Sequence, residues 1–453
     1  MINLQTVPPP EQSSEAIAER VEESPSPQVI TSAPQPSTTR RRVVTAAAQT
    51  LIGTTRYATA RFQMYTPAPG IHSFSGTLQT LKERLIQWSP LGSFVSPERY
   101  RNSPVRLELV SDHSPDMVLQ YYDTYTDQDG NVTRLLTEPG LDLSPGHYWL
   151  NLLIPEVTGP RHQRKTTWRF IRRLPLKLLP DEPSPEEQHR AVICDIDGTV
   201  YYTAYQTFLE MLSTAYTKPA GKVFIEGMPL LLRTLRDEPN TTLHGVSCSP
   251  EKLRDFIQET TQRERFQFDT LRLNKDFSAT RSRERLIYKI TRCLELFEEL
   301  PCRSTVLLIG DNKEQDTQTY ELLKDLFELP PEGVHAHVTA WATQVIATAN
   351  QLRPGTVNLT HVPFVRTRLE SLALTVLARK HHSPDVFIVE SHRPSPDYLT
   401  LVRQLASRKD TCFCANGHEI LATLMKRHQR DIRRLDFLLR NTREPKVLEY
   451  IES

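Results

Sequence analysis

Hydrophobic and polar positions change their spacing several times along the chain. Residues 1–42 show no apolar periodicity and are rich in Pro, Ser, Thr, Gln and Glu, so we expect a disordered N-terminus. In the following stretch, "GTLQTLKERLIQW" repeats apolar residues at helical spacing, on one face made of Leu78, Leu81, Leu85 and Ile86. We therefore predict a helical segment over residues 43–99.

From residue 105 onward the spacing becomes that of a strand, because "VRLEL" alternates apolar and polar residues. The stretch "MVLQYYDTYTDQDGNVTRLL" predicts two strands that turn at Asp129 and Gly130, where glycine permits a positive φ. "LSPGHYWLNLLIP" and "KTTWRFIRRLPL" predict further strands. Together they indicate a small all-β, β-sandwich-like domain over residues 100–178, whose aromatic residues we interpret as core.

A polar, proline-rich stretch, "LPDEPSPEEQ" at residues 179–188, marks a domain boundary. Beyond it, the apolar runs "AVICDI", "TTLHGVS" and "STVLLIG" alternate with amphipathic helical patterns. This alternation predicts an α/β domain over residues 188–350, with a parallel sheet covered by helices. The strand-like runs "DVFIVES" and "DTCFCAN" and the helical patterns that follow them predict an α/β C-terminal extension over residues 354–453.

The charge balance argues against polyanion binding by the chain as a whole. There are 55 Lys and Arg against 54 Asp and Glu, and acidic residues lie between the arginines of the last helical pattern. We therefore expect no nucleic-acid partner. The "RRR" at residues 40–42 could touch an anionic surface, although a solvated linker end is the favoured interpretation.

Cysteine usage and hydropathy bear on the compartment. The six cysteines include no CxxC pair, and we interpret Cys412 and Cys414 of "CFCANGH" as strand residues rather than metal ligands. The N-terminus is polar, and the longest apolar run, "VVTAAAQTLIG", is too short to span a bilayer. These features predict a cytoplasmic protein and leave peripheral contact with a membrane open.

Polar residues end three predicted strands of the α/β domain. Asp195 ends the first within "DIDGT", Ser247 ends the second within "VSCSP", and Asp311 ends the third within "GDNKEQD". In an open parallel sheet such ends gather at one edge, where clustered carboxylates repel one another. A divalent, oxygen-binding cation such as Mg²⁺ relieves that repulsion and usually shares its coordination with a phosphate.

This set of residues resembles the haloacid dehalogenase superfamily of phosphotransferases, which implies a Rossmann-like, parallel-sheet catalytic domain. The resemblance implies that Asp195 attacks phosphorus and forms an aspartyl-phosphate, and that Asp197 acts as general acid and base. It makes Ser247 the phosphate-binding hydroxyl, assisted by the backbone or hydroxyl of Thr199. It also implies Mg²⁺ bound by the Asp195 and Asp311 carboxylates and the Asp197 carbonyl.

The superfamily further requires a lysine that neutralises the nucleophile and the phosphate. Lys252, Lys275 and Lys289 are candidates. Lys289 is preferred as the catalytic and phosphate-binding lysine, because "SRERLIYKITRCLELFEELP" predicts a helix that leads into the last strand. Asp316 is a supporting residue that would position Asp311 or Lys289, or cap the helix "DTQTYELLKDLF".

A closer resemblance covers residues 188–330. The stretches "EGMPLLLRTL", "LHGVSCSPEKLRDFIQ", "FQFDTLRL", "YKITRCLELFEELP" and "LLIGDNKEQDTQTYELL" follow the order of the phosphatidate phosphatases related to the yeast actin-patch protein. Lys289 is in register with the family's lysine. The chain departs from the family at Gly198, where "DIDDT" is usual, at Glu251, where Trp is frequent, and at Lys313, where a small residue is usual. These departures bear on the substrate, whereas the catalytic carboxylates are retained.

The resemblance implies a Mg²⁺-dependent phosphoric monoester hydrolase that acts on phosphatidate or a related lipid phosphate. One alternative is a phosphatase of a soluble phosphoester or a phosphoprotein. Another, from a different class, is a binding protein whose phosphatase fold has lost activity. Five site residues are intact, which argues against the inactive alternative. They are Asp195, Asp197, Ser247, Lys289 and Asp311.

The spacing of the motifs predicts an active site without a folded lid. Only 26 residues separate Thr199 from Glu226, and 41 separate Ser247 from Lys289, which is too few for a separate α/β cap. An uncapped site suits a bulky substrate such as a lipid at a membrane surface. Aromatic residues after the nucleophile either line the approach or form a packed helix face: Tyr201, Tyr202, Tyr205 and Phe208.

Overall fold

The computed structural model describes much of Val43–Ser453, which forms one compact unit. The described residues are 45–46, 51–66, 98–128, 130–137, 141–158, 165–184, 188–202, 223–250, 254–274, 285–312, 315–352, 362–390, 411–428, 432–442 and 444–452. The predicted disordered N-terminus and the helical pattern around Leu78 lie outside these ranges.

A six-stranded sheet forms the centre of the α/β region, and every neighbouring pair in it is parallel. Its order is β12, β11, β10, β13, β14, β15. The strands span Thr270–Asn274, Thr241–Pro250, Arg190–Cys194, Thr305–Asp311, Asp385–Val389 and Thr411–Cys414, respectively. The prediction of an α/β fold with a parallel sheet is confirmed. Burial of both faces explains why the inner strands read as continuous apolar runs.

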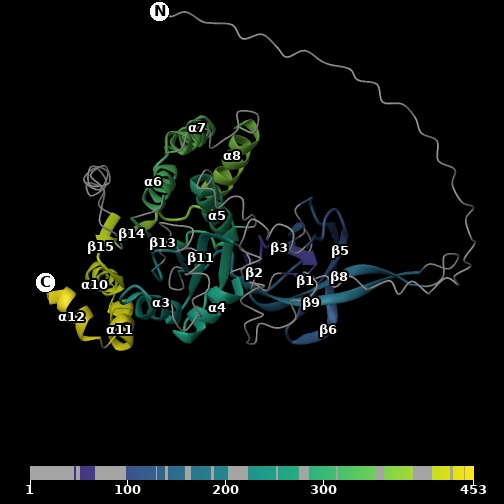
Figure 1. The fold of residues 1–453 in the computed structure, drawn as a ribbon, viewed down its shortest axis with the longest axis horizontal. Helices are drawn as coiled ribbons and strands as arrows, with labels where there is room; N and C mark the ends of the chain where they lie inside the picture. Colours follow the sequence, from purple (N-terminus) through teal and green to yellow (C-terminus); the bar gives the residue numbers. More distant parts are fainter. Residues whose placement is uncertain are drawn as a thin grey trace, which may run out of the picture. The chain divides into compact units, whose positions relative to one another are not determined.

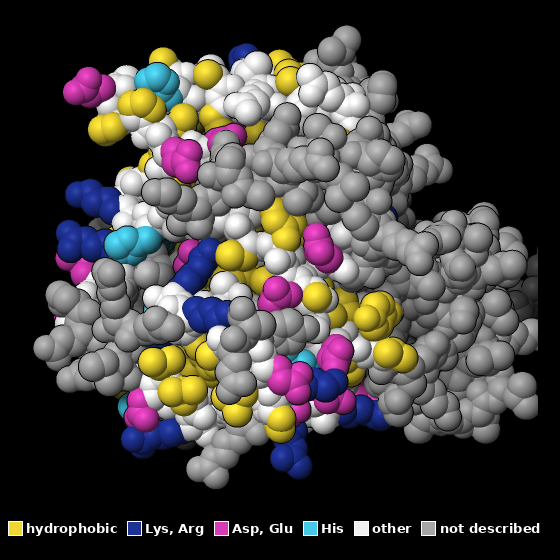
Figure 2. Space-filling view, turned by 90° about the vertical axis from the view of Figure 1, so that its left-hand side faces the viewer, with side chains coloured by type: hydrophobic (Ala, Val, Ile, Leu, Met, Phe, Trp, Pro, Cys, Tyr) yellow, Lys and Arg dark blue, Asp and Glu magenta, His cyan; other side chains and the backbone are white. Residues whose placement is uncertain are grey.

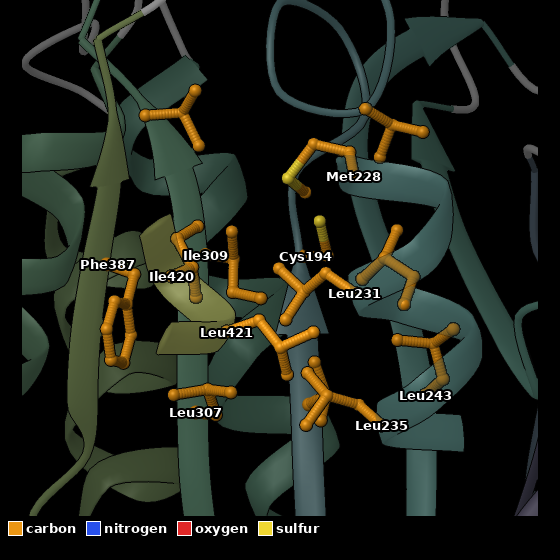
Figure 3. Packing of buried hydrophobic residues seen from close by; sticks show 14 of the residues in the cluster. Cys194, Met228, Leu231, Leu235, Leu243, Leu307, Ile309, Phe387, Ile420 and Leu421 are labelled. Carbon is orange, nitrogen blue, oxygen red and sulfur yellow. The ribbon is translucent and has the colours of Figure 1, made fainter. Parts of the chain in front are cut away.

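Helices cover both faces of this sheet (Figure 1). One face packs against α5 (Arg285–Glu299), α6 (Asp316–Phe327), α7 (Val334–Leu352) and α8 (Val362–Ala378). The other packs against α3 (Met228–Asp237), α4 (Arg254–Arg263), α10 (Gly417–Arg427), α11 (Ile432–Asn441) and α12 (Pro445–Glu452). Figure 3 shows the second core, in which side chains of α3 and α10 meet those of β10, β11, β13 and β14.

Two glycines let the first turns of α3 and α10 approach closely. A Cβ on Gly417 would lie 2.4 Å from the carbonyl carbon of Gly227, and a Cβ on Gly227 would lie 2.5 Å from the His418 nitrogen. The Gly417 N–H donates to the Glu226 carbonyl at 2.9 Å. Any side chain at either glycine would push the two helices apart.

The C-terminal residues do not form a separate extension, which corrects the prediction for residues 354–453. Strand β14 pairs with β13 in the register Asp311↔Val389, and β15 pairs with β14. The pairing is long-range, so local periodicity could not reveal it. The last helical pattern there forms more than one helix, because α10 ends at Arg427 and α11 begins at Ile432.

The arginines of this region divide between two environments. Arg434 is buried and pairs with Glu238 at 2.7 Å, whereas Arg440 pairs with Asp436 on an exposed helix face. Arg434 is therefore not part of a solvated helix face. On the surface drawn in Figure 2, basic and acidic side chains are interspersed.

Part of the segment 43–99 forms strands, so the prediction of a helical segment is wrong for its described residues. These strands are β1 (Thr45–Ala46), β2 (Leu51–Thr54), β3 (Thr59–Thr66) and β4 (Glu98–Arg99). In "TARFQMYT", Ala60, Phe62 and Met64 alternate into the core, which is a strand pattern. The helical prediction rested on the pattern around Leu78 and was extended over the whole segment, although "TARFQMYT" has the alternation of a strand.

The N-terminal strands and those up to Leu179 form two sheets. The five-stranded sheet has the order β2, β9, β8, β5, β6, and the other joins β1, β3, β4 and β7. Their remaining strands are β5 (Pro104–Ser111), β6 (Ser114–Tyr125), β7 (Asn131–Leu135), β8 (Gly146–Thr158) and β9 (Lys165–Leu179). Strand β7 pairs with β3 and not with β6, so β6 and β7 do not form the hairpin predicted around Gly130. The chain instead leaves the five-stranded sheet after β6 and enters the other sheet at β7.

Buried ion pairs connect β3 with the helix that carries Lys289. Arg61 binds Glu298 at 2.8 Å and Glu299 at 3.0 Å, both near the end of α5. Arg272 of β12 also binds Glu299, at 2.5 Å. Burial raises the pKa of Glu299, an effect that the neighbouring Arg272 and Arg61 partly offset.

A ladder of buried histidines and hydroxyls crosses the amino-terminal end of the sheet. His189 contacts the Ser304 hydroxyl at 2.9 Å and the Thr242 hydroxyl at 3.1 Å. His244 contacts the hydroxyls of Thr242 and Thr270, each at 2.8 Å. Burial lowers the pKa of both histidines to about 3, so they are neutral in the native protein near neutral pH.

None of the helices among the described residues is long and apolar enough to cross a bilayer. All six cysteines are free thiols; Cys414 is buried and Cys412 is half-buried.

Candidate active site

The carboxyl ends of β10, β11 and β13 bring the predicted site residues to one edge of the sheet. Asp195 directly follows β10, and its N–H donates to the Ile309 carbonyl of β13 at 2.8 Å. Asp311 is the last residue of β13, and Ser247 lies in β11. All three side chains are buried. The parallel pairing of the three strands therefore brings together residues that are more than one hundred positions apart in the sequence, such as Asp195 and Asp311.

Lys289 reaches this edge from α5. Its side chain is only 2% exposed, and its Nζ donates to the Asp195 Oδ1 at 2.8 Å. The Thr199 hydroxyl donates to the other Asp195 oxygen at 3.3 Å. A buried ammonium beside a buried carboxylate keeps the carboxylate charged, which a nucleophile requires. The alternative lysines, Lys252 and Lys275, lie outside the described residues.

Asp316 connects the lysine with the last acidic residue. Its Oδ1 accepts a bond from Lys289 Nζ, and its Oδ2 accepts one from the Asp311 N–H at 3.2 Å. Asp316 is the first residue of α6, whereas the N-cap residue is Gln315. Of the roles considered for Asp316, the geometry therefore favours positioning of Lys289 and Asp311 over capping.

Asp197 accepts two hydroxyl bonds on one oxygen. Its Oδ2 is 2.7 Å from the Ser247 hydroxyl and 2.5 Å from the Ser249 hydroxyl. Sequence reasoning did not single out Ser249. The signal was present in "VSCSP", because residues two apart on a strand point to the same side.

Gly198 allows the turn after the nucleophile to contact Asp311. Its φ is +83°, and a Cβ there would lie 2.2 Å from the Asp311 Oδ2. The Gly198 N–H donates to the Tyr201 carbonyl at 3.1 Å, which closes the turn. In this conformation a larger residue at position 198, such as the aspartate usual in the related phosphatases, would displace the Asp311 carboxylate.

The donor set fits a magnesium ion. Among the described residues, no three His, Cys, Asp or Glu side chains form a metal-binding group. The expected site needs only two carboxylates, Asp195 and Asp311, together with the Asp197 carbonyl. The contact of Asp311 Oδ2 with the Gly198 position brings that carboxylate against the main chain beside Asp197. Buried oxygen donors of this kind are those that Mg²⁺ prefers.

The aromatic residues after the nucleophile differ in exposure. Tyr201 is buried, and its ring meets that of Phe224 edge-on at 6.2 Å. Packing is therefore the correct interpretation for Tyr201. Tyr202 is 48% exposed, and Tyr205 and Phe208 lie outside the described residues. The described residues thus leave only Tyr202 of the four as a candidate for contact with a substrate.

Two buried polar groups near the nucleophile stay protonated. Burial raises the pKa of the Cys194 thiol and of the Tyr320 hydroxyl far above their usual values, and the nearby carboxylates act in the same direction. The thiol donates to the Asp195 carbonyl at 2.9 Å, and the hydroxyl donates to the Ile309 carbonyl at 3.0 Å. Cys194 is therefore not a competing nucleophile.

Residues 190–334 match the family model of the phosphatidate phosphatase APP1 catalytic domain. The matched segment begins at β10 and contains all the site residues described above. The expected resemblance of this segment to the phosphatidate phosphatases is therefore confirmed. A comparison with curated protein sequences found no match.

Solved structures show weaker likenesses. A D,D-heptose 1,7-bisphosphate phosphatase from B. bronchiseptica, crystallised with magnesium and phosphate, is 11% identical with a TM-score of 0.28, over 52% of this chain and 99% of its own. A Pnkp1/Rnl/Hen1 complex is 17% identical with a TM-score of 0.22, over 35% of this chain and 50% of its own. At such TM-scores neither likeness bears on the mechanism.

Proposed function

We propose that the chain is a Mg²⁺-dependent phosphatase that hydrolyses phosphatidate or a related lipid phosphate through an aspartyl-phosphate. The observation that carries the proposal is the buried contact of Lys289 with both Asp195 and Asp316. A buried lysine that links the nucleophile candidate to the residue holding Asp311 is costly to keep without a function. The family match supports the phosphatidate assignment.

Each residue has a definite part in the proposed reaction. An Asp195 oxygen attacks phosphorus, the bond from phosphorus to the lipid oxygen breaks, and Asp197 gives its proton to that leaving oxygen. Lys289 and the Ser247 hydroxyl hold the phosphoryl oxygens. Asp197 then takes a proton from water, which attacks the aspartyl-phosphate and releases phosphate. When bound by Asp195, Asp311 and the Asp197 carbonyl, Mg²⁺ supplies compensation for the negative charge of the transferring group.

The same residues would serve a soluble phosphoester or a phosphoprotein, so the leaving group must be tested. The short intervals between the motifs support an open site, which suits a lipid in a membrane. This proposal includes a cytoplasmic protein that meets the membrane at its periphery. An inactive binding protein would have no reason to retain the contacts of Lys289.

The test is phosphate release by purified protein from phosphatidate in mixed micelles and from a panel of sugar phosphates and phosphopeptides. We expect release from phosphatidate with Mg²⁺ and its loss with EDTA. Asp195→Asn should abolish it with an unchanged circular dichroism spectrum, since the amide keeps the shape but cannot attack phosphorus. Asp123→Asn is the matched control, because Asp123 pairs with Arg106 on an exposed strand. If the protein hydrolyses sugar phosphates but not phosphatidate, the lipid assignment is refuted and the phosphatase assignment stands.

A further inference from the structure

The two hydroxyls on Asp197 are not equivalent. Ser247 Oγ donates to Asp197 Oδ2 at 2.7 Å and accepts a bond from the Ser249 N–H at 2.8 Å. Ser249 Oγ donates to the same Oδ2 at 2.5 Å and is assigned no role by the mechanism above. Its side chain is 6% exposed, so it is part of the buried site.

A serine hydroxyl carries one proton and can donate only one hydrogen bond at a time. Ser247 now uses its proton on Asp197. To hold a phosphoryl oxygen, Ser247 must turn that proton toward the phosphate, and Asp197 Oδ2 then loses this donor. The Ser249 proton can stay on the carboxyl group, because the proposed mechanism assigns the phosphate to Ser247 and not to Ser249.

We propose that Ser249 is the residue that holds Asp197 in its proton-transfer position while Ser247 binds the phosphate. Ser249 is thus a positioning residue that acts through Asp197. A hydroxyl that keeps donating to Oδ2 fixes the rotation of the carboxyl group both before and after Asp197 gives up a proton from its other oxygen. The inference rests on the proposed function, in which Asp197 is the general acid and Ser247 the phosphate ligand.

The experiment compares esters that differ in their need for a general acid. Nitrophenolate leaves without a proton, whereas the alkoxide of phosphatidate does not. Ser249→Ala should lower kcat/KM for phosphatidate by about 10- to 100-fold, which is at or below the roughly 100-fold lower limit for loss of a general acid, because Asp197 itself remains. It should lower kcat/KM for p-nitrophenyl phosphate several-fold less. Ser247→Ala should lower kcat/KM for both esters alike, because both present the same phosphoryl group.

Binding measurements separate positioning from phosphate contact. Calorimetric titration with inorganic phosphate and Mg²⁺ should give an unchanged affinity for Ser249→Ala and a weakened one for Ser247→Ala. Ser249→Thr keeps the hydroxyl and should restore the activity on phosphatidate. Ser304→Ala is the control for loss of a buried hydroxyl, because Ser304 binds His189 at the opposite end of the sheet.

Each outcome decides the inference. Equal losses on both esters, or weaker phosphate binding by Ser249→Ala, would overturn the positioning role and make Ser249 a structural or phosphate-binding residue. If Ser249→Ala does not fold, the Ser249→Thr and Ser249→Cys pair makes the same comparison, with Cys as the weaker donor. Wild-type protein inactive on both esters would overturn the proposed function and the inference with it, which is a different result from equal losses in an active enzyme.

Discussion

Acid should destabilise this protein well above the pH at which its carboxylates protonate. His189 and His244 have a pKa of about 3 in the native state, against an ordinary value of 6.5. Below pH 6.5 the unfolded chain takes up a proton on each histidine and the native state does not. Since a lowered native pKa contributes stability above the unfolded pKa, that stability falls as the pH drops from 6.5 toward 3.

The magnitude follows from the two pKa values. Between pH 7 and pH 5, each histidine removes about 2 kcal/mol from the free energy of unfolding, so the pair removes about 4 kcal/mol. His381, whose pKa burial lowers to about 4, adds about 2 kcal/mol over the same interval. A total of about 6 kcal/mol is comparable to the whole stability of many domains.

Urea unfolding followed by circular dichroism at pH 7, 6 and 5 measures this loss. His244→Gln removes one titrating group, so its free energy of unfolding should fall by about 2 kcal/mol less than that of the wild type between pH 7 and 5. His382→Gln is the control, because His382 is exposed. A wild-type stability that is flat over this range, or equal pH dependence in the two variants, would refute the argument from burial.

Two further substitutions have matched controls. Gly198→Ala should lower phosphatase activity and weaken Mg²⁺ binding in calorimetry, because its Cβ would displace Asp311 Oδ2, whereas Gly333→Ala also has a positive φ but its Cβ meets nothing nearer than 3.9 Å. Retained Mg²⁺ affinity in Gly198→Ala would contradict the contact. Arg61→Met should lower the free energy of unfolding by about 3–5 kcal/mol, since it breaks buried pairs with α5. Arg56→Met, whose pair with Glu182 is exposed, should change it by less than about 1 kcal/mol, and similar effects of the two variants would refute the reasoning.

The sequence reveals the elements whose evidence is local. The strands that lead to Asp195 and Asp311 are short apolar runs that end on polar residues, and their positions agree closely with β10 and β13. The structure also brings Lys289 to Asp195, as the resemblance implied.

What the sequence hides is the pairing between distant segments. The partner of Asp311 in the sheet is Val389, and no local pattern encodes that register. The same limit explains why β7 joins β3, although "DGN" looks like a hairpin turn. Ser249 was missed for another reason, since its role depends on which way Asp197 points.

Because β14 and β15 belong to the catalytic sheet, the segment that matches the family model is shorter than the folding unit. A protein cut after residue 334 would end at the start of α7 and leave β13 as an edge strand, with unpaired N–H and C=O groups along one side. The strand that carries Asp311 would then be open to pairing with other chains, and α3 would lose the helix that packs on it through Gly417. A minimal protein that keeps this sheet and the packing of α10 on α3 intact must therefore extend beyond the matched segment, at least through α10.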